Sequence, residues 1–120
     1  MPNYSTISVE TDDGDTLIAV LSRRVYLQVV DTFREELQEV INATTGGILL
    51  NLEKVSVMNS VGLGVLIGAH DQLSKKNRPF VITNLQPLMH DIFARMKLET
   101  VIAVRKTQSE GLEHLRSARK

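Results

Sequence analysis

A short apolar run, Ile48-Leu49-Leu50-Asn51-Leu52, lies near the middle of the chain, directly after Gly46 and Gly47. A run of this length without polar alternation is typical of a strand that is buried on both faces of a sheet. Helices supply that cover when neighbouring strands are parallel, because the connections between parallel strands cross over the faces of the sheet. We therefore expect a central strand of an α/β fold here.

Helical and strand-like segments alternate on both sides of this run. Apolar residues recur at three- and four-residue spacing from Leu27 onward, which predicts an amphipathic helix, and a second such pattern starts at Val61. Pro79 ends the second helix, because proline disfavours its continuation. The expected order is strands at residues 4–10 and 16–21, a helix at 27–41, strand 48–52, helix 61–76, strand 80–83, helix 87–96, strand 101–104, and a last helix opened by a capping box at Thr107 and Glu110.

This order predicts one mixed, largely parallel β-sheet of four to five strands, flanked by about four α-helices. The first two strands form a hairpin, because Asp12-Asp13-Gly14-Asp15 is typical of a turn. Right-handed crossovers through the helices join the parallel strands. A chain of 120 residues fits a single domain, and we place that domain over residues 1–120.

Charge and apolar content exclude several classes of function. Lys plus Arg and Asp plus Glu both number 14, so the formal net charge is zero and no global field draws the chain to nucleic acid. The longest apolar stretch, residues 61–69, is much shorter than the roughly 20 residues that span a bilayer. The first residues lack the features of a secretory signal. We expect a cytoplasmic protein with no membrane insertion and no direct contact with nucleic acid.

No residue pattern supports catalysis, a cofactor or a metal site. Cysteine is absent, and His70, His90 and His114 are too scattered to assemble a set of metal ligands. The chain has no phosphate-binding glycine loop, and the residues before Ser60 lack the first glycine of a hydrolase nucleophile elbow. We therefore expect a protein that binds another protein and is not an enzyme.

Ser60 is the strongest candidate for a control point. It lies in Met58-Asn59-Ser60-Val61-Gly62, where a strand turns into a helix, and functional surfaces of open α/β sheets gather beyond the carboxyl ends of the strands. One interpretation is structural, because a serine hydroxyl can cap the helix. The other is modification, because helix amides favour an anion and a phosphoryl group would add about −1.5 to −2 charges to a neutral binding face.

Three glycines follow Ser60 within the expected helix. Gly62, Gly64 and Gly68 each cost a helix interior roughly 1 kcal/mol relative to alanine, so something must offset them. Close packing on a neighbouring element would do so, and so would the close approach of a partner's backbone. Packing is the favoured interpretation for the group, whereas for Gly62, beside Ser60, we favour the partner.

The segment around Ser60 resembles a known family. Leu50-Asn51-Leu52-Glu53-Lys54-Val55-Ser56-Val57-Met58-Asn59-Ser60-Val61-Gly62-Leu63-Gly64-Val65-Leu66 is similar to the signature of STAS domains of the anti-sigma factor antagonist type, and the likeness continues to Val101-Ile102. The resemblance implies that Ser60 is phosphorylated by a partner serine kinase, which is also an anti-sigma factor, and dephosphorylated by a metal-dependent serine phosphatase. It also implies that the unmodified form binds the kinase and thereby frees a sigma factor.

The resemblance further implies a partner-binding face around Ser60, made of Asn59, Gly62, Arg23, Arg24 and Tyr26. Asn59 stands where antagonists usually have aspartate, so a charged pair with a kinase arginine would weaken. Arg23 and Tyr26 stand where glycine and aspartate are common. Because the family also includes scaffold subunits of stress-sensing assemblies and soluble subunits of lipid-transport machines, a constitutive structural subunit is the alternative. The exposed face of so small a domain could also pair weakly with a second copy or join a larger assembly.

Overall fold

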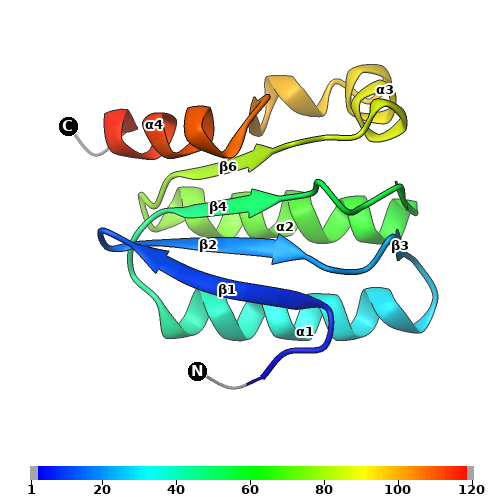
Figure 1. The fold of residues 1–120 in the computed structure, drawn as a ribbon, viewed down its shortest axis with the longest axis horizontal. Coiled ribbons are helices and arrows are strands. Elements are labelled where there is room, and N and C mark those ends of the chain that lie inside the picture. Colours follow the sequence, from blue (N-terminus) through cyan, green and yellow to red (C-terminus); the bar gives the residue numbers. More distant parts are fainter. Residues whose placement is uncertain (1–2, 119–120) are drawn as a thin grey trace.

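A mixed five-stranded sheet with the order β1-β2-β4-β6-β7 forms the centre of the computed structural model, which describes residues 3–118 (Figure 1). β1 pairs with β2 in antiparallel register, and the remaining neighbours pair in parallel. This arrangement confirms the predicted mixed, largely parallel sheet. The strand bounds are Ile7–Asp12 for β1, Asp15–Val20 for β2, Ile48–Asn51 for β4, Phe80–Thr83 for β6 and Ala103–Arg105 for β7.

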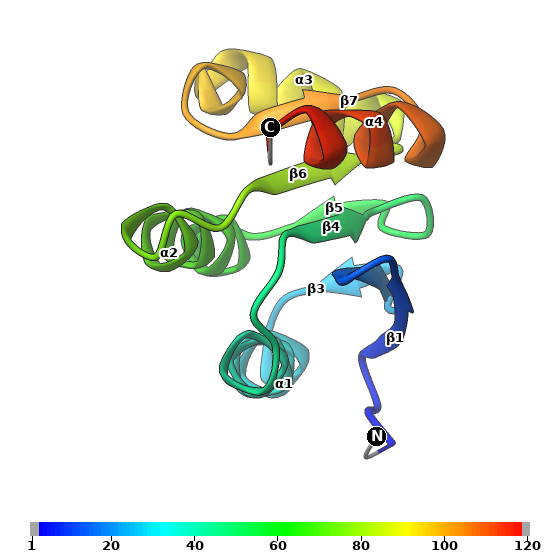
Figure 2. The same ribbon diagram turned by 90° about the vertical axis from the view of Figure 1, so that its left-hand side faces the viewer.

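Helices cover both faces of the sheet, as predicted. α1 and α2 lie side by side on one face, and α4 lies on the other face over β4 and β6 (Figure 2). A short 3-10 helix, Leu98–Thr100, follows α3 and leads into β7. The helix bounds are Gln28–Ala43 for α1, Ser60–Lys75 for α2, Pro87–Arg95 for α3 and Gln108–Ala118 for α4.

The core explains why β4 is apolar without alternation. Ile48 and Leu50 point to the face under α1 and α2 and join its cluster of buried side chains. Leu49 points to the other face and packs with Leu115 of α4. Since successive side chains of a strand point to opposite faces, a strand that is covered twice requires apolar residues at every position.

Three strands differ from the sequence-based expectation. Residues 24–25 and 57–58 form a second, two-stranded parallel sheet of β3 (Arg24–Val25) and β5 (Val57–Met58), which the sequence analysis did not predict. Val101 was expected to open the last strand, but it is 51% exposed and its amide donates to the Leu98 carbonyl at 3.0 Å. The chain is therefore still turning at Val101, and β7 begins only at Ala103.

The ends of two helices test the capping expectations. The amide of Glu110 donates to Thr107 Oγ1 at 3.1 Å, which confirms the predicted cap at the start of α4. The apolar pattern placed Leu27 on the buried face of the first helix, and this prediction is wrong. Leu27 precedes α1, is 74% exposed and has a φ angle of 54°.

Two buried ionisable residues close the edge of the sheet at the amino ends of its parallel strands. Asp15 is 2% exposed, and its Oδ1 accepts a hydrogen bond from the Gly47 amide at 2.9 Å. Arg78 is 9% exposed and donates to the carbonyls of Gly46 at 2.7 Å and Ile41 at 2.9 Å. Its third bond goes to Thr44 Oγ1 at 2.7 Å. Arg78 thus satisfies one carbonyl that the end of α1 leaves open and one carbonyl of the loop before β4.

Candidate functional site

Ser60 is the first residue of α2, at the carboxyl edge of the sheet, and it is exposed. The cap of this helix is Asn59, whose Oδ1 accepts a hydrogen bond from the Gly62 amide at 2.9 Å. The structural interpretation of Ser60 as the capping residue is therefore wrong, because the asparagine before it has that role. Asparagine is among the best capping residues, so the helix needs nothing from the serine hydroxyl.

The Ser60 hydroxyl is available for chemistry. Within residues 3–118 the side chain of Ser60 takes part in no hydrogen bond. An α-helix leaves its first amides without partners inside the helix, and the Asn59 cap engages the amide of Gly62 only. The amides of Ser60 and Val61 remain at the positive end of a helix that runs to Lys75. An anion on Ser60 would meet favourable electrostatics there.

The second sheet places the loop after β2 beside Ser60. The amide of Ser56 donates to the Arg23 carbonyl at 2.7 Å, and the amide of Asn59 donates to the Val25 carbonyl at 3.1 Å. β3 and β5 pair in register between these two bonds. Arg23 and Arg24 are exposed and Tyr26 is half-buried. The backbone thus brings the segments that carry Arg23, Arg24, Tyr26, Asn59 and Ser60 to one edge of the molecule (Figure 1).

Two exposed apolar residues flank this edge, and the sequence analysis did not assign either to the site. Leu27 has φ 54° and ψ −134°, a backbone region that bulky residues rarely adopt. Strained residues of this kind concentrate at functional sites. Val61, expected on the buried half of its helix, is 47% exposed. No sequence signal separated them from core residues, because helical periodicity ignores where the helix starts and what covers it.

Gly62 does not belong to the exposed face. It is buried, and a Cβ atom at this position would lie 2.3 Å from Cγ of Met58 and 3.3 Å from the Val25 carbonyl oxygen. Close packing against β3 and β5 therefore accounts for this glycine. The expectation that a partner's backbone approaches Gly62 is wrong, because Met58 occupies the space that a partner would need.

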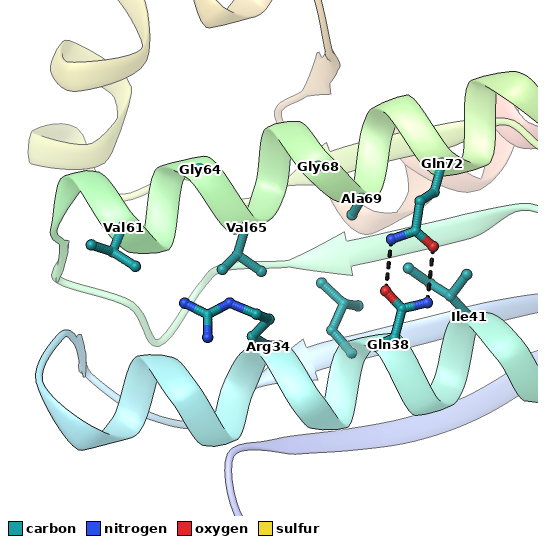
Figure 3. A pocket seen from close by; sticks show the side chains of 10 residues that line it. Arg34, Gln38, Ile41, Val61, Gly64, Val65, Gly68, Ala69 and Gln72 are labelled. Carbon is teal, nitrogen blue, oxygen red and sulfur yellow. Dashed lines mark hydrogen bonds between the residues drawn. The ribbon is translucent and has the colours of Figure 1, made fainter.

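Gly64 and Gly68 show the opposite situation. Both are exposed, and a Cβ atom at either position would meet no other atom within 4 Å. Packing within the domain, which we favoured for these glycines, does not account for them. They line a groove of about 410 Å³ between α1 and α2 (Figure 3). Packing within the domain therefore explains Gly62, where we expected a partner, and it does not explain Gly64 and Gly68, where we expected packing.

The described residues 3–118 hold no group of side chains that suggests a metal centre. Within the described part of the chain, no cluster of three or more His, Asp or Glu residues could hold a metal ion. None of the helices in residues 3–118 is long and apolar enough to pass through a bilayer. The chemistry of the Ser60 edge is therefore that of an exposed hydroxyl, two guanidinium groups and exposed apolar side chains.

Comparisons with known proteins agree with this fold. Residues 6–111 match the family model of the STAS domain, and the chain belongs to that family. The anti-sigma-B factor antagonist of Listeria monocytogenes is 26% identical over 106 residues, which cover 88% of this chain and 92% of the relative. The fold also matches the crystal structure of an anti-sigma factor antagonist from Mycobacterium paratuberculosis, with a TM-score of 0.84, 20% identity and coverage of 92% and 93% of the two chains.

A third similar protein has been seen in a modified state. The fold matches the Bacillus cell fate determinant SpoIIAA in its phosphorylated form, with a TM-score of 0.67 and 19% identity. The match covers 90% of this chain and 97% of SpoIIAA.

Proposed function

We propose that this protein is an anti-sigma factor antagonist controlled by phosphorylation of Ser60. In this proposal the unmodified protein binds a serine kinase that is also an anti-sigma factor, and the phosphorylated protein releases it. A serine phosphatase restores the binding form. The protein acts in the cytoplasm as one non-catalytic domain over residues 1–120. The Listeria relative, named an antagonist of the anti-sigma-B factor, supports the class of partner.

The observation that carries the proposal is the state of the Ser60 hydroxyl. It is exposed and without a hydrogen bond in the described part of the chain, and Asn59 performs the capping that would otherwise occupy it. A kinase can therefore reach the hydroxyl without unfolding the helix. The phosphorylated form of the similar SpoIIAA supports phosphorylation as the modification.

Phosphorylation changes this edge in two ways. A phosphoryl group brings about −1.5 to −2 charges to a surface whose exposed apolar side chains a partner would bury, and burying such a charge without a partner is costly. The group also competes for Arg23, which directly precedes β3, and for Arg24, the first residue of β3, which pairs with β5 just before Ser60. Arg23 and Arg24 are then no longer available to form ion pairs with acidic groups of the kinase.

The test measures binding of the purified serine kinase that phosphorylates Ser60, by isothermal titration calorimetry with wild-type, Ser60→Ala and Ser60→Asp proteins. We expect Ser60→Ala to bind like the unmodified wild type and Ser60→Asp to bind at least tenfold more weakly. Peptide mapping after the kinase reaction should place the phosphate on Ser60. Equal binding by the two variants would contradict the switch and favour a constitutive structural subunit.

A further inference from the structure

A groove runs along the surface between α1 and α2, starting at the edge that carries Ser60. The two helices lie side by side on the same face of the sheet and both begin at this edge (Figures 1 and 3). Val61, the residue directly after Ser60, lines the groove. The groove is therefore a continuation of the Ser60 edge along the side of the molecule.

The walls of the groove are largely apolar, and two glycines interrupt the side chains along the α2 wall. Leu37 and Ile41 of α1 and Val65 and Ala69 of α2 line it, and Gly64 and Gly68 expose helix backbone. A Cβ atom at either glycine would meet open space. Glycine at such positions allows another backbone to approach closely. The domain itself makes no use of that freedom.

The far end of the groove is closed by a pair of amides. Gln38 Nε2 donates to Gln72 Oε1 at 2.9 Å, and Gln72 Nε2 donates to Gln38 Oε1 at 2.6 Å (Figure 3). From Val61 to Gln72, α2 rises roughly 16 Å at about 1.5 Å per residue, which equals three helical turns. The groove thus has an open entrance at Ser60, a defined length and a fixed end.

Among the described residues that line the groove, Arg34 is the one with an ionisable side chain. Its side chain reaches between the helices toward Val61 and Val65 (Figure 3). It forms an ion pair with Asp31 at 3.1 Å, but both side chains are largely exposed, at 49% and 69%. Exposed pairs of this kind contribute little, so Arg34 can exchange Asp31 for a carboxylate of a bound molecule.

We propose that the groove docks an amphipathic helix of about three turns from the anti-sigma factor, with small apolar residues toward Gly64 and Gly68 and a carboxylate toward Arg34. This inference rests on the proposed function and adds a second contact to it. Helices bind in apolar grooves through anchors spaced three and four residues apart, and the length and lining of this groove fit that mode. Continuity with the Ser60 edge selects the anti-sigma factor as the occupant, because one molecule can engage both sites.

The experiment fills the groove without disturbing the fold. Gly64→Phe and Gly68→Phe place a ring where no atom lies within 4 Å of the new Cβ. Ser74→Phe introduces the same side chain at an exposed position of α2 that does not line the groove, and serves as the matched control. Binding of the purified kinase is measured for each protein by titration calorimetry, and folding is checked by circular dichroism and thermal unfolding.

We expect the two glycine variants to bind the kinase at least tenfold more weakly and Ser74→Phe to bind like the wild type. A second pair of variants tests the groove by reversing a charge. Arg34→Glu should weaken kinase binding at least fivefold, whereas Lys75→Glu, which lies outside the groove, should leave it unchanged. Folded groove variants that bind like the wild type, with Ser60→Asp still defective, would overturn the docking site and leave the proposed function standing.

Two further outcomes decide the identity of the occupant. If the wild type itself fails to bind the kinase that phosphorylates Ser60, both the proposed function and the docking site are overturned. Sedimentation velocity of the same variants without kinase tests a second copy of this chain as the occupant. If the substitutions at Gly64 and Gly68 abolish self-association and leave kinase binding unchanged, the groove is a homodimer contact and the proposal is wrong.

Discussion

The two edges of the central sheet differ in what they do with their polar and apolar groups. At the amino edge, Asp15 and Arg78 are almost fully buried, and their side chains bond to the backbone of the loop before β4. At the carboxyl edge, Leu27, Val61 and Leu88 are between 47% and 74% exposed. The amino edge thus buries polar side chains, whereas the carboxyl edge exposes apolar ones.

This contrast separates stability from function. Buried polar groups with complete hydrogen bonding fix the local structure, and removing one partner leaves the other unsatisfied. Exposed apolar side chains and the strained backbone of Leu27 give the isolated domain no comparable benefit. Departures from local preference are expected at functional sites, which supports our proposal that a partner binds at the carboxyl edge.

The largest effect is expected at the amino edge. Arg78→Leu removes the donors to the carbonyls of Gly46 and Ile41, and should lower the free energy of unfolding by about 3 kcal/mol. Urea denaturation measures the change. Arg116→Leu is the matched control, because Arg116 is half-exposed and pairs with Asp12 at 3.4 Å, and it should cost below about 1 kcal/mol. Equal losses in the two variants would show that the buried hydrogen bonds of Arg78 contribute no more to stability than an exposed ion pair.

Leu27→Gly should act in opposite directions on stability and binding. Relief of the positive φ angle outweighs the entropy cost of glycine and should raise the free energy of unfolding by about 1 kcal/mol. Affinity for the kinase should fall, because an exposed apolar contact is lost. Leu88→Gly, inside α3, is the control and should destabilise the fold. A stabilised variant with unchanged affinity would show that Leu27 is not a contact.

The cap of α2 gives a further comparison between adjacent residues. Asn59→Ala should lower the free energy of unfolding by about 1 kcal/mol, because the Gly62 amide loses its acceptor. Ser60→Ala should leave stability unchanged. Thermal unfolding followed by circular dichroism distinguishes the two variants. A loss of stability in Ser60→Ala would show that the serine hydroxyl contributes to the cap of α2.

The smallest effects are expected at the glycines of α2. Gly68→Ala should stabilise the protein by about 0.5–1 kcal/mol, because alanine is the better helix former and its Cβ meets open space. Gly62→Ala should destabilise it, since its Cβ would crowd Met58. The difference in melting temperature between the two variants is the measurement. The same sign in both would contradict the assignment of one glycine to packing and the other to an open surface.

The sequence predicted the order of the main strands and helices because each one carries a repeated local signal. β4 begins with an uninterrupted apolar run, and the apolar residues of α1 repeat at helical spacing along 16 residues. β3 and β5 have two residues each and form only by pairing Arg24 with Val57 and Val25 with Met58. A pairing between distant residues leaves no local period, so these strands were missed.

The candidate site was predicted in part. The position of Ser60 at the start of a helix followed from local pattern and family resemblance, and the structure places it there. The roles of Gly62 and Gly68 were exchanged, because periodicity shows which residues share a face but not whether another element covers that face. Leu27 and Val61 were assigned to the core for the same reason. Cover depends on tertiary packing, which a single sequence does not display.

The attachment of β3 bears on how such a protein can acquire a new partner. Its bonds to residues 56–59 involve only main-chain atoms of Arg23 and Val25, so they persist whatever side chains stand at 23, 24, 26 and 27. If the partner binds at this edge, as we propose, substitutions at these positions change recognition while the core stays intact. In a cell with several proteins of this kind, divergence confined to one short segment is enough to insulate their signalling pathways from one another.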